Sequence, residues 1–368
     1  MTFTWKNALH SASLASLLFV AACGGAKQEE SAAAPAAEAA KTEFNVGWSI
    51  YAGWMPWPYA EKSGILKKWA DKYGIKINLI QVNDYVESVN QYTAGKLDGV
   101  SVTNMDALTI PAAGGKDTTL LIMGDYSNGN DGIVINGPGT VSSLKGKAIN
   151  LVELSVSHYL LARALEMNGL KLSDVKTVNT SDADIVGAFG TKDVTAVAAW
   201  NPQLTQIKKA PGATEVFNSS NIPNEIQDIM SVSTPTLKSN PNLGKALVGA
   251  WYEVLAIMAR GDAESAKAIA EMAKLSGTDT ANYQGQLKTT FLYYKPADAV
   301  AYVSGPDVVK HMDGVRRFSF AKGLFGPSAT SVDAIGIEFP NGTVLGDKHN
   351  IKLRYDASFM KMAADGKL

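Results

Sequence analysis

From residue 43 onward, short apolar segments alternate with segments of helical periodicity. Phe44–Ser49, Lys76–Val82 and Gly99–Thr103 have the length and composition of strands, and apolar residues at helical spacing lie between them. This alternation is typical of α/β folds with largely parallel sheets. Further strands are expected at 119–124, 133–135, 148–152 and 194–199, and helices at 58–73, 84–95, 157–168 and 184–189.

The length of 368 residues favours two lobes, since a domain holds roughly 150 residues. Ile229–Ser233 has the composition of a second crossing between lobes, and the last third of the chain has apolar helical faces. We therefore expect one lobe made of residues 43–135 plus 230–368 and a second made of residues 136–229. Each should hold a mixed sheet flanked by helices, with a helical C-terminal part. Ligands of such folds bind in the crevice at the carboxyl ends of the strands.

The amino terminus has the features of an export signal. Residues 1–22 carry Lys6 and then a short apolar run that ends at Val20-Ala21-Ala22-Cys23. These residues resemble the bacterial lipobox, which implies that Cys23 is lipidated and becomes the first residue of the mature chain. The alternative is a buried or free cysteine after a simple signal. Residues 23–42 are rich in Ala, Glu and Pro, which predicts a tether between the anchor and the folded body.

Composition argues against several classes of function. Cys23 is the one cysteine, so a disulfide framework and a Cys-rich zinc site are excluded. The formal net charge of -1 argues against a nucleic-acid partner. His158, His311 and His349 are far apart and have no metal-ligand spacing, and there is no phosphate-binding, dinucleotide or hydrolase motif. Enzymatic chemistry therefore has little support, and we expect neither a cofactor nor a metal.

Aromatic residues gather where the first strand ends. Tyr51, Trp54 and Trp57 fall within a loop of the segment 48–59, and Trp200 ends the strand expected at 194–199. Aromatic faces attract cations by about 0.5–2 kcal/mol for each good contact. The loop is therefore expected to form one wall of a ligand site, with Trp200 as the second wall. The alternative is that Trp54 and Trp57 pack the lobe onto its first helix.

Polar residues follow other expected strands. Asp106 comes after the strand 99–103. Its carboxylate would accept two parallel N–H bonds from a guanidinium. The alternative is an ordinary acid at the start of a helix. Glu153, Ser155 and His158 lie where a strand turns into a helix. They are candidate ligand contacts, with helix capping as the alternative for Ser155 and a structural hydrogen bond for His158. Asp131 and Asp228 lie at the two expected lobe crossings, and we predict that they form hinge hydrogen bonds.

Six segments in order carry a family resemblance. They are Gly53–Trp57, Ala94–Gly99, Asp131–Val134, Leu144–Lys147, Ser155–Leu161 and Ala198–Pro202. With the lipobox and tether, the chain resembles a solute-binding protein of a bacterial ABC importer, from the nitrate, sulfonate and taurine group with the type II periplasmic fold. Within that group it is similar to binding proteins encoded beside urea-carboxylase-type enzymes. It departs from the anion-binding relatives at Glu153–Val156, where they carry Gly-Ser-Thr or Gly-Ser-Ser.

The resemblance implies capture of a small nitrogenous solute, guanidine or urea, between Tyr51, Trp54 and Trp200, oriented by Asp106 and Glu153. A monomer in the periplasm, lipid-anchored to a membrane, would deliver the solute to an inner-membrane permease with its cytoplasmic ATPase. One alternative is a nitrate-, sulfonate- or taurine-type anion held by the helix N-terminus at Ser155. The other is a thiamine-pyrimidine-related enzyme or a sensor domain, although the Cys-rich loop of such enzymes is missing from this sequence.

Overall fold

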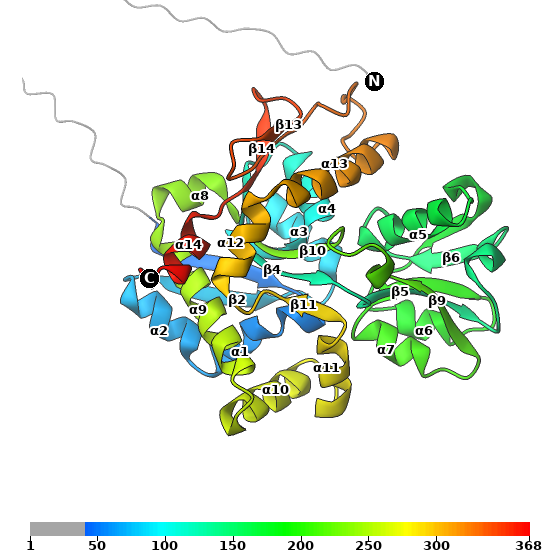
Figure 1. Ribbon diagram of the computed structural model, residues 1–368, viewed down its shortest axis with the longest axis horizontal. Coiled ribbons are helices and arrows are strands. Elements are labelled where there is room, and N and C mark those ends of the chain that lie inside the picture. Colours follow the sequence, from blue (N-terminus) through cyan, green and yellow to red (C-terminus); the bar gives the residue numbers. More distant parts are fainter. Residues whose placement is uncertain (1–40) are drawn as a thin grey trace, which may run out of the picture. The chain divides into compact units, whose positions relative to one another are not determined.

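A computed structural model describes residues 41–368 (Figure 1). The expected signal, Cys23 and nearly all of the tether lie outside the described residues, so these predictions stay untested. Within residues 41–368, no helix combines the length and the apolar character needed to cross a bilayer.

Two mixed sheets organise the described chain. The strands of the nine-stranded sheet are β1 (Glu43–Trp48), β2 (Lys76–Gln81), β3 (Gly99–Thr103), β4 (Thr118–Ser127), β10 (Gln227–Ser233), β11 (Thr290–Leu292), β12 (Gly336–Glu338), β13 (Val344–Leu345) and β14 (Ile351–Tyr355). Their order is β13-β12-β14-β4-β10-β3-β1-β2, and β11 pairs with β4. We call the part built on this sheet the first lobe.

The five-stranded sheet forms the second lobe. Its strands are β5 (Asp131–Asn136), β6 (Ala148–Leu151), β7 (Lys176–Asn179), β8 (Ala196–Trp200) and β9 (Ala213–Asn218), in the order β7-β6-β8-β5-β9. Helix α5 (Val156–Met167) lies on one face of this sheet, and α6 (Ile185–Phe189) and α7 (Gln203–Lys208) lie on the other (Figure 1). The two-lobed α/β architecture expected from the alternating pattern is confirmed.

The remaining helices belong to the first lobe. They are α1 (Pro56–Lys62), α2 (Ile65–Lys72), α3 (Tyr85–Thr93), α4 (Asn104–Ala107), the π-helical turn Leu108–Ala112, α8 (Thr234–Ser239), α9 (Asn242–Ala259), α10 (Ala263–Leu275), α11 (Thr280–Leu287), α12 (Pro296–Ser304), α13 (Pro306–Ala321) and α14 (Ser358–Ala364). Short 3-10 turns lie at 52–54, 141–144, 172–174 and 219–221. The helix expected at 58–73 is two helices, because Gly64 adopts a left-handed φ of 79° between them.

The lobe boundary differs from the expected one. We predicted that residues 133–135 would belong to the first lobe, but Ile133 lies opposite Ala198 of β8 and Phe217 of β9 in the second sheet. The chain therefore crosses at 128–130, directly after β4, and returns at 219–226, before β10. A buried apolar strand carries no sequence signal for which of two sheets it joins.

The C-terminal part and the strand directions also differ from expectation. The last third is not purely helical, because β12, β13 and β14 extend the first sheet, with Leu353 opposite Thr118 of β4. These strands have two to five residues, too short for a clear period-two pattern. Strand β10 runs antiparallel to both β3 and β4, so the sheet is mixed, as expected for each lobe, although the alternating pattern is typical of largely parallel sheets.

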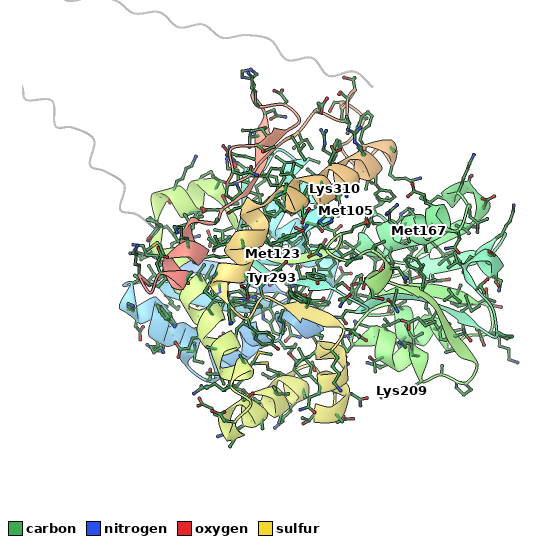
Figure 2. All side chains as sticks on the ribbon, viewed as in Figure 1. Met105, Met123, Met167, Lys209, Tyr293 and Lys310 are labelled. Carbon is green, nitrogen blue, oxygen red and sulfur yellow. The ribbon has the colours of Figure 1, made fainter. Side chains whose placement is uncertain are left out.

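Buried side chains separate clearly from exposed ones. Met105 and Met123 lie in the interior of the first lobe, whereas Met167 and Lys209 project from the second (Figure 2).

The last third of the chain was predicted to carry apolar helical faces, and the one on α9 is buried. Its Gly249 allows close contact with Trp69, since a Cβ there would lie 2.4 Å from the indole.

Candidate functional site

A small enclosed cavity lies where the two lobes meet. We call it the inner cavity, and its lining residues are Ser49, Tyr51, Trp54, Tyr85, Thr103, Asp131, Val156, Trp200, Ile226 and Asp228. The volume open to the centre of a water molecule is about 20 Å³. A cavity of this size holds a solute of only a few non-hydrogen atoms.

Strand register brings the acidic residues together. On β10, Asp228 lies opposite Thr103 of β3 and opposite Asp125 of β4. On β5, Asp131 lies opposite Trp200 of β8. Because β5 begins only four residues after β4 ends, its first residue stays near the end of the first sheet. We call Asp125, Asp131 and Asp228 the acidic cluster.

An aromatic chain forms much of the wall. Tyr51 meets Trp54 edge to face with ring centroids 5.0 Å apart, and Trp54 lies 5.7 Å from Tyr85. Tyr85 in turn meets Trp200 edge to face at 5.7 Å. These centroid distances lie within the range of favourable aromatic pairs. The chain therefore runs from the loop after β1 to the end of β8 and joins the two lobes.

Several buried polar atoms at this place have no hydrogen-bond partner among the described residues. They are Asp125 Oδ2, Asp131 Oδ1, Asp228 Oδ2 and Trp54 Nε1. A buried polar group without a partner costs about 1–3 kcal/mol, and more if it is charged. Asp131 and Asp228 also line the inner cavity, so a bound solute with N–H groups would satisfy their two free oxygens.

The other oxygens of two acids are held in place. Tyr51 Oη donates to Asp125 Oδ1 at 3.2 Å, and Ser127 Oγ donates to Asp131 Oδ2 at 2.5 Å. The hydroxyl of Ser127 also lies 2.6 Å from that of Ser219, so it ties together the two chain crossings. One oxygen of each carboxyl is thus fixed by the protein, and the second oxygen of Asp131, which lines the inner cavity, has no partner among the described residues.

Burial without a cation raises the pKa of every member of the cluster. Burial raises the pKa of Asp125 to about 8 and that of Asp131 to about 7. The pKa of Asp228 is raised well above its ordinary value by burial and by the negative charges of Asp125 and Asp131. In its empty state the cluster therefore retains protons near neutral pH.

The lining offers negative charge and no positive charge. None of the lining residues is Lys, Arg or His. Within residues 41–368 no group of three or more His, Cys, Asp or Glu side chains is arranged to hold a metal ion. The arrangement thus favours an organic cation, because a cation can pair with these carboxyls once they release their protons, whereas an anion meets no cationic side chain in the lining.

Asp106 does not line the inner cavity but holds two residues that do. Its Oδ2 accepts from Tyr85 Oη at 2.6 Å and from Thr103 Oγ1 at 2.9 Å. Burial raises its pKa to about 6. The sequence placed Asp106 against the ligand, whereas the structure places it one layer further out.

Trp57 was wrongly expected to line the ligand site. It is 1% exposed and packs against Trp251 of α9 with ring centroids 4.9 Å apart. The alternative interpretation, packing of the lobe onto its first helix, holds for Trp57. It does not hold for Trp54, which lines the inner cavity. Trp57 is the second residue of α1, whose inward face is covered by α9.

The strand-to-helix turn of the second lobe also lies away from the inner cavity. Glu153 accepts a hydrogen bond from Thr177. Ser155 caps α5 by accepting from Ser157 N at 3.2 Å, and His158 Nδ1 accepts from Leu154 N at 3.3 Å. The structure thus contains the alternatives given for two of these residues: Ser155 caps a helix and His158 makes a structural hydrogen bond. Glu153 does not contact the acidic cluster.

Three residues of the site escaped the sequence analysis. Asp125 lies within an apolar strand, and a single acid in such a run was the available signal. Tyr85 and Thr103 sit at a helix start and a strand end, where they look like ordinary structural residues. Asp131 and Asp228, predicted as hinge residues, lie beside the crossings and also line the inner cavity.

Comparison with known proteins adds the family. The NMT1/THI5-like family matches residues 60–260, which is more than half of the 368 residues. The chain belongs to the NMT1/THI5-like family. The match runs from the last residues of α1 to the end of α9 and includes the whole second lobe.

Curated relatives of this NMT1/THI5-like protein are partial matches. A protein of Brucella abortus (strain 2308) named "Putative binding protein" is 28% identical over 151 residues, which are 41% of this chain and 46% of that protein. The chain thus spans about half the length of the curated Brucella relatives it matches. The "Putative aliphatic sulfonates-binding protein" of Escherichia coli (strain K12) is 41% identical over 63 residues, 17% of this chain and 20% of that protein.

Solved structures confirm the expected two-lobed periplasmic-binding-protein fold. The alkanesulfonate-binding protein SsuA from Xanthomonas axonopodis pv. citri, bound to MOPS, has a TM-score of 0.64 at 19% identity, covering 78% of this chain and 96% of that one. The periplasmic nitrate-binding protein NrtA from Synechocystis PCC 6803 has a TM-score of 0.56 at 12% identity, covering 89% and 99%. At these identities the likeness concerns the fold alone.

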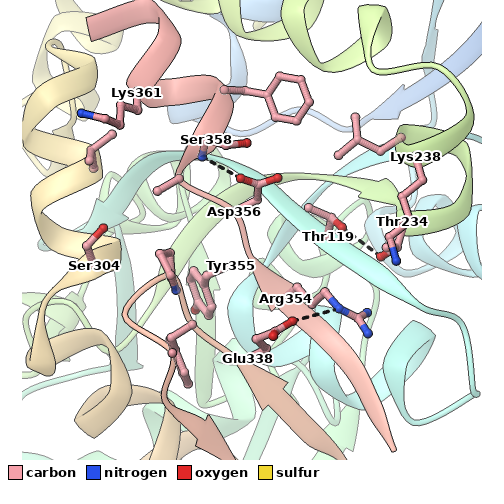
Figure 3. A pocket seen from close by; sticks show the side chains of 17 residues that line it. Thr119, Thr234, Lys238, Ser304, Glu338, Arg354, Tyr355, Asp356, Ser358 and Lys361 are labelled. Carbon is pink, nitrogen blue, oxygen red and sulfur yellow. Dashed lines mark hydrogen bonds and ion pairs between the residues drawn. The ribbon is translucent and has the colours of Figure 1, made fainter. Parts of the chain in front are cut away.

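The NMT1/THI5-like protein has a larger hollow elsewhere on its first lobe (Figure 3). It lies among α8, α12, β12, β14 and α14, and carries both signs of charge, with Arg354 Nε 3.1 Å from Glu338 Oε2. Thr119 and Thr234 hydroxyls bond each other at 2.9 Å. No buried side-chain atom in its described lining lacks a partner. The inner cavity is therefore the better candidate for the functional site.

In the NMT1/THI5-like protein, Gly53 packs against the acidic cluster. A Cβ on Gly53 would lie 2.3 Å from Asp125 Oδ2 and 2.7 Å from the Tyr51 ring. We expect Gly53→Ala to displace both groups, lowering stability by about 1–3 kcal/mol and weakening solute binding. Chemical unfolding and calorimetry measure the two effects. Gly187→Ala is the control, because a Cβ there meets nothing within 4 Å; equal behaviour of the two variants would contradict the prediction.

Proposed function

We propose that the protein is the solute-binding component of an ABC importer that captures a small planar cation of the guanidinium type between its two lobes. The observation that carries this proposal is that Asp131 and Asp228, which line the cavity, each have a buried carboxylate oxygen without a partner, while no cationic side chain lines it. Buried charges are normally paired, and here the solute would supply the pair.

Guanidinium has the size and shape that this site requires. It is flat, it has four non-hydrogen atoms and it directs N–H groups to three sides, so it can donate to Asp131 and Asp228 while its face lies against an aromatic ring. The carboxylates support the cation over neutral urea, because charge-assisted hydrogen bonds are about twice as strong as neutral ones. Urea remains the closest neutral competitor.

An anionic solute is the second candidate, and the relatives' names favour it. The similar proteins are described as binding sulfonates or nitrate. The inner cavity supports the opposite charge, since an anion would have to enter beside Asp131 and Asp228 without a counter-ion. The helix N-terminus at Ser155, which would hold an anion, is capped by the serine hydroxyl.

As an importer component, the protein would work in the periplasm and catalyse no reaction. The monomer would pass its solute to an inner-membrane permease with a cytoplasmic ATPase, and lipid on Cys23 would keep it at a membrane. The lobe order and the Brucella relative named as a binding protein support this role. The lipid anchor is tested separately with a Cys23→Ala variant. If this variant still partitioned with membranes, the result would contradict lipidation of Cys23.

A calorimetric panel tests the solute class. We expect saturable binding of guanidinium by the purified protein, weaker binding of urea, and no response to nitrate or taurine. Guanidinium is used at millimolar concentration, far below denaturing levels, with tetramethylammonium chloride as the control for ionic strength. Saturable nitrate or taurine binding with no response to guanidinium would exclude the cation proposal and leave the anion candidate.

A further inference from the structure

A second hollow lies on the outer side of Asp106, and we call it the outer hollow. Its lining residues are Val86, Asn90, Asp106, Thr109, Ile110, Glu153, Leu154, Ser155, Gly323, Leu324 and Gly326. The volume open to the centre of a water molecule is about 350 Å³, against about 20 Å³ in the inner cavity. Glu153, Leu154 and Ser155 come from the second lobe and the other residues from the first, so the outer hollow also lies between the lobes.

Asp106 lines the outer hollow and is hydrogen-bonded to two residues that line the inner cavity. Its Oδ2 accepts from Tyr85 and Thr103, which line the inner cavity. Its Oδ1 has no partner among the described residues, although Asp106 is only 1% exposed, and the same side chain lines the outer hollow. The two compartments are thus separated by one hydrogen-bonded layer, made of Tyr85, Asp106 and Thr103.

The outer hollow attracts cations. Its charged lining residues are Asp106 and Glu153, and neither Lys, Arg nor His lines it. Thr109 Oγ1 is a further buried oxygen without a partner among residues 41–368. Asp106 Oδ1 can accept from a solute that carries N–H donors, and the Thr109 hydroxyl can accept as well as donate.

Leu154 has a backbone conformation that costs energy. Its φ is 66°, in the left-handed region that a leucine rarely adopts, and its side chain is 51% exposed at the edge of the outer hollow. The N–H of Leu154 donates to His158 Nδ1 at 3.3 Å, which holds this turn. A glycine would take the same φ without strain.

We propose that the outer hollow is an entry compartment in which a guanidinium-type cation binds against Asp106 and Glu153, beneath Leu154, before it passes Tyr85 into the inner cavity. This inference rests on the proposed function and adds the route and a second binding position. In it, Leu154 limits passage in both directions, and Glu153 raises the rate of capture by its charge.

The route predicts two distinct kinetic changes. Leu154→Gly removes the obstruction and the strain, so association and dissociation both accelerate at least about threefold while the dissociation constant stays within twofold. Glu153→Gln removes a charge far from the final position, so association slows about two- to fivefold at low salt and dissociation is unchanged. A glutamine at this position can still accept the hydrogen bond from Thr177.

Stopped-flow tryptophan fluorescence with guanidinium chloride measures these rates on the full-length protein. Met167→Ala is the control for Leu154→Gly, since Met167 is an exposed apolar residue on α5 outside the outer hollow. Asp193→Asn is the control for Glu153→Gln, since Asp193 is exposed and lies outside it as well. Both controls should match the parent protein.

The outcomes separate this inference from the function on which it rests. A parent protein that does not bind guanidinium overturns both. A parent that binds, with parental rates in Leu154→Gly and Glu153→Gln, overturns the entry route alone. If Leu154→Gly does not fold, the Glu153→Gln variant alone tests the entry route. The route requires that this variant associate with guanidinium more slowly and dissociate at the parental rate.

Discussion

Replacing Asp131 with asparagine should weaken guanidinium binding at least about 30-fold, because removing one partner of a buried charge-assisted bond costs about 2–5 kcal/mol. The asparagine can still accept from Ser127, so the crossing keeps its hydrogen bond. At pH 8 the same variant should unfold at a higher temperature than the parent when no solute is present, since one uncompensated buried charge has been removed. Calorimetric titration and thermal unfolding measure the two effects.

The opposite signs of these effects make the prediction specific. A substitution that merely damages the fold lowers both affinity and stability, whereas here affinity falls and stability rises. Asp193→Asn, which makes the same chemical change at an exposed position of the second lobe, should alter neither quantity. Affinity within threefold of the parent in Asp131→Asn would show that the acidic cluster does not hold the solute.

Stability of the solute-free protein should fall as pH rises from about 5 to 8. The pKa of Asp131 is about 7 and that of Asp125 about 8, both above the ordinary value of 3.8. Between these values the folded state holds protons that the unfolded state has released, so stability decreases with pH by at most about 1.4 kcal/mol per pH unit for each group. Thermal unfolding in buffers of constant ionic strength measures the slope.

Solute affinity should change with pH in the opposite direction. A bound cation favours ionised carboxylates, so binding below pH 8 must expel protons, and the dissociation constant should fall as pH rises from about 5 to 8. The increase in unfolding temperature caused by millimolar guanidinium should therefore grow over this range. Tetramethylammonium at equal concentration serves as the control. An affinity that does not depend on pH would contradict ligand binding by acids of raised pKa.

Local sequence predicted most strands and helices between residues 43 and 233, but not β7, β9 and α7. Segments such as Gly99–Thr103 match their strands because burial on both faces demands a continuous apolar run. The errors lie where tertiary context decides. Nothing local assigns β5 to the second sheet, and β12 and β13, with three and two residues, are strands only because β14 lies beside β4.

The sequence predicted the aromatic residues of the candidate site more accurately than its acidic residues. Tyr51, Trp54 and Trp200 line the inner cavity as expected, because loops at strand ends face the space between lobes. The acids were assigned differently. Asp106 and Glu153 line the outer hollow, whereas Asp125 and Asp228 meet through antiparallel pairing of β4 and β10, which join residues about a hundred positions apart. Such a pairing leaves no trace in local sequence.

The acidic cluster is divided between two pieces of the molecule. Asp228, Asp125 and Tyr51 belong to the nine-stranded sheet and its loops, whereas Asp131 and Trp200 belong to the five-stranded sheet. Neither piece alone surrounds a cation, and water would reach each carboxylate once the pieces separate. Retention of cargo would then require closure, and a transporter that pulled the two halves apart would release the solute without having to compete for its hydrogen bonds.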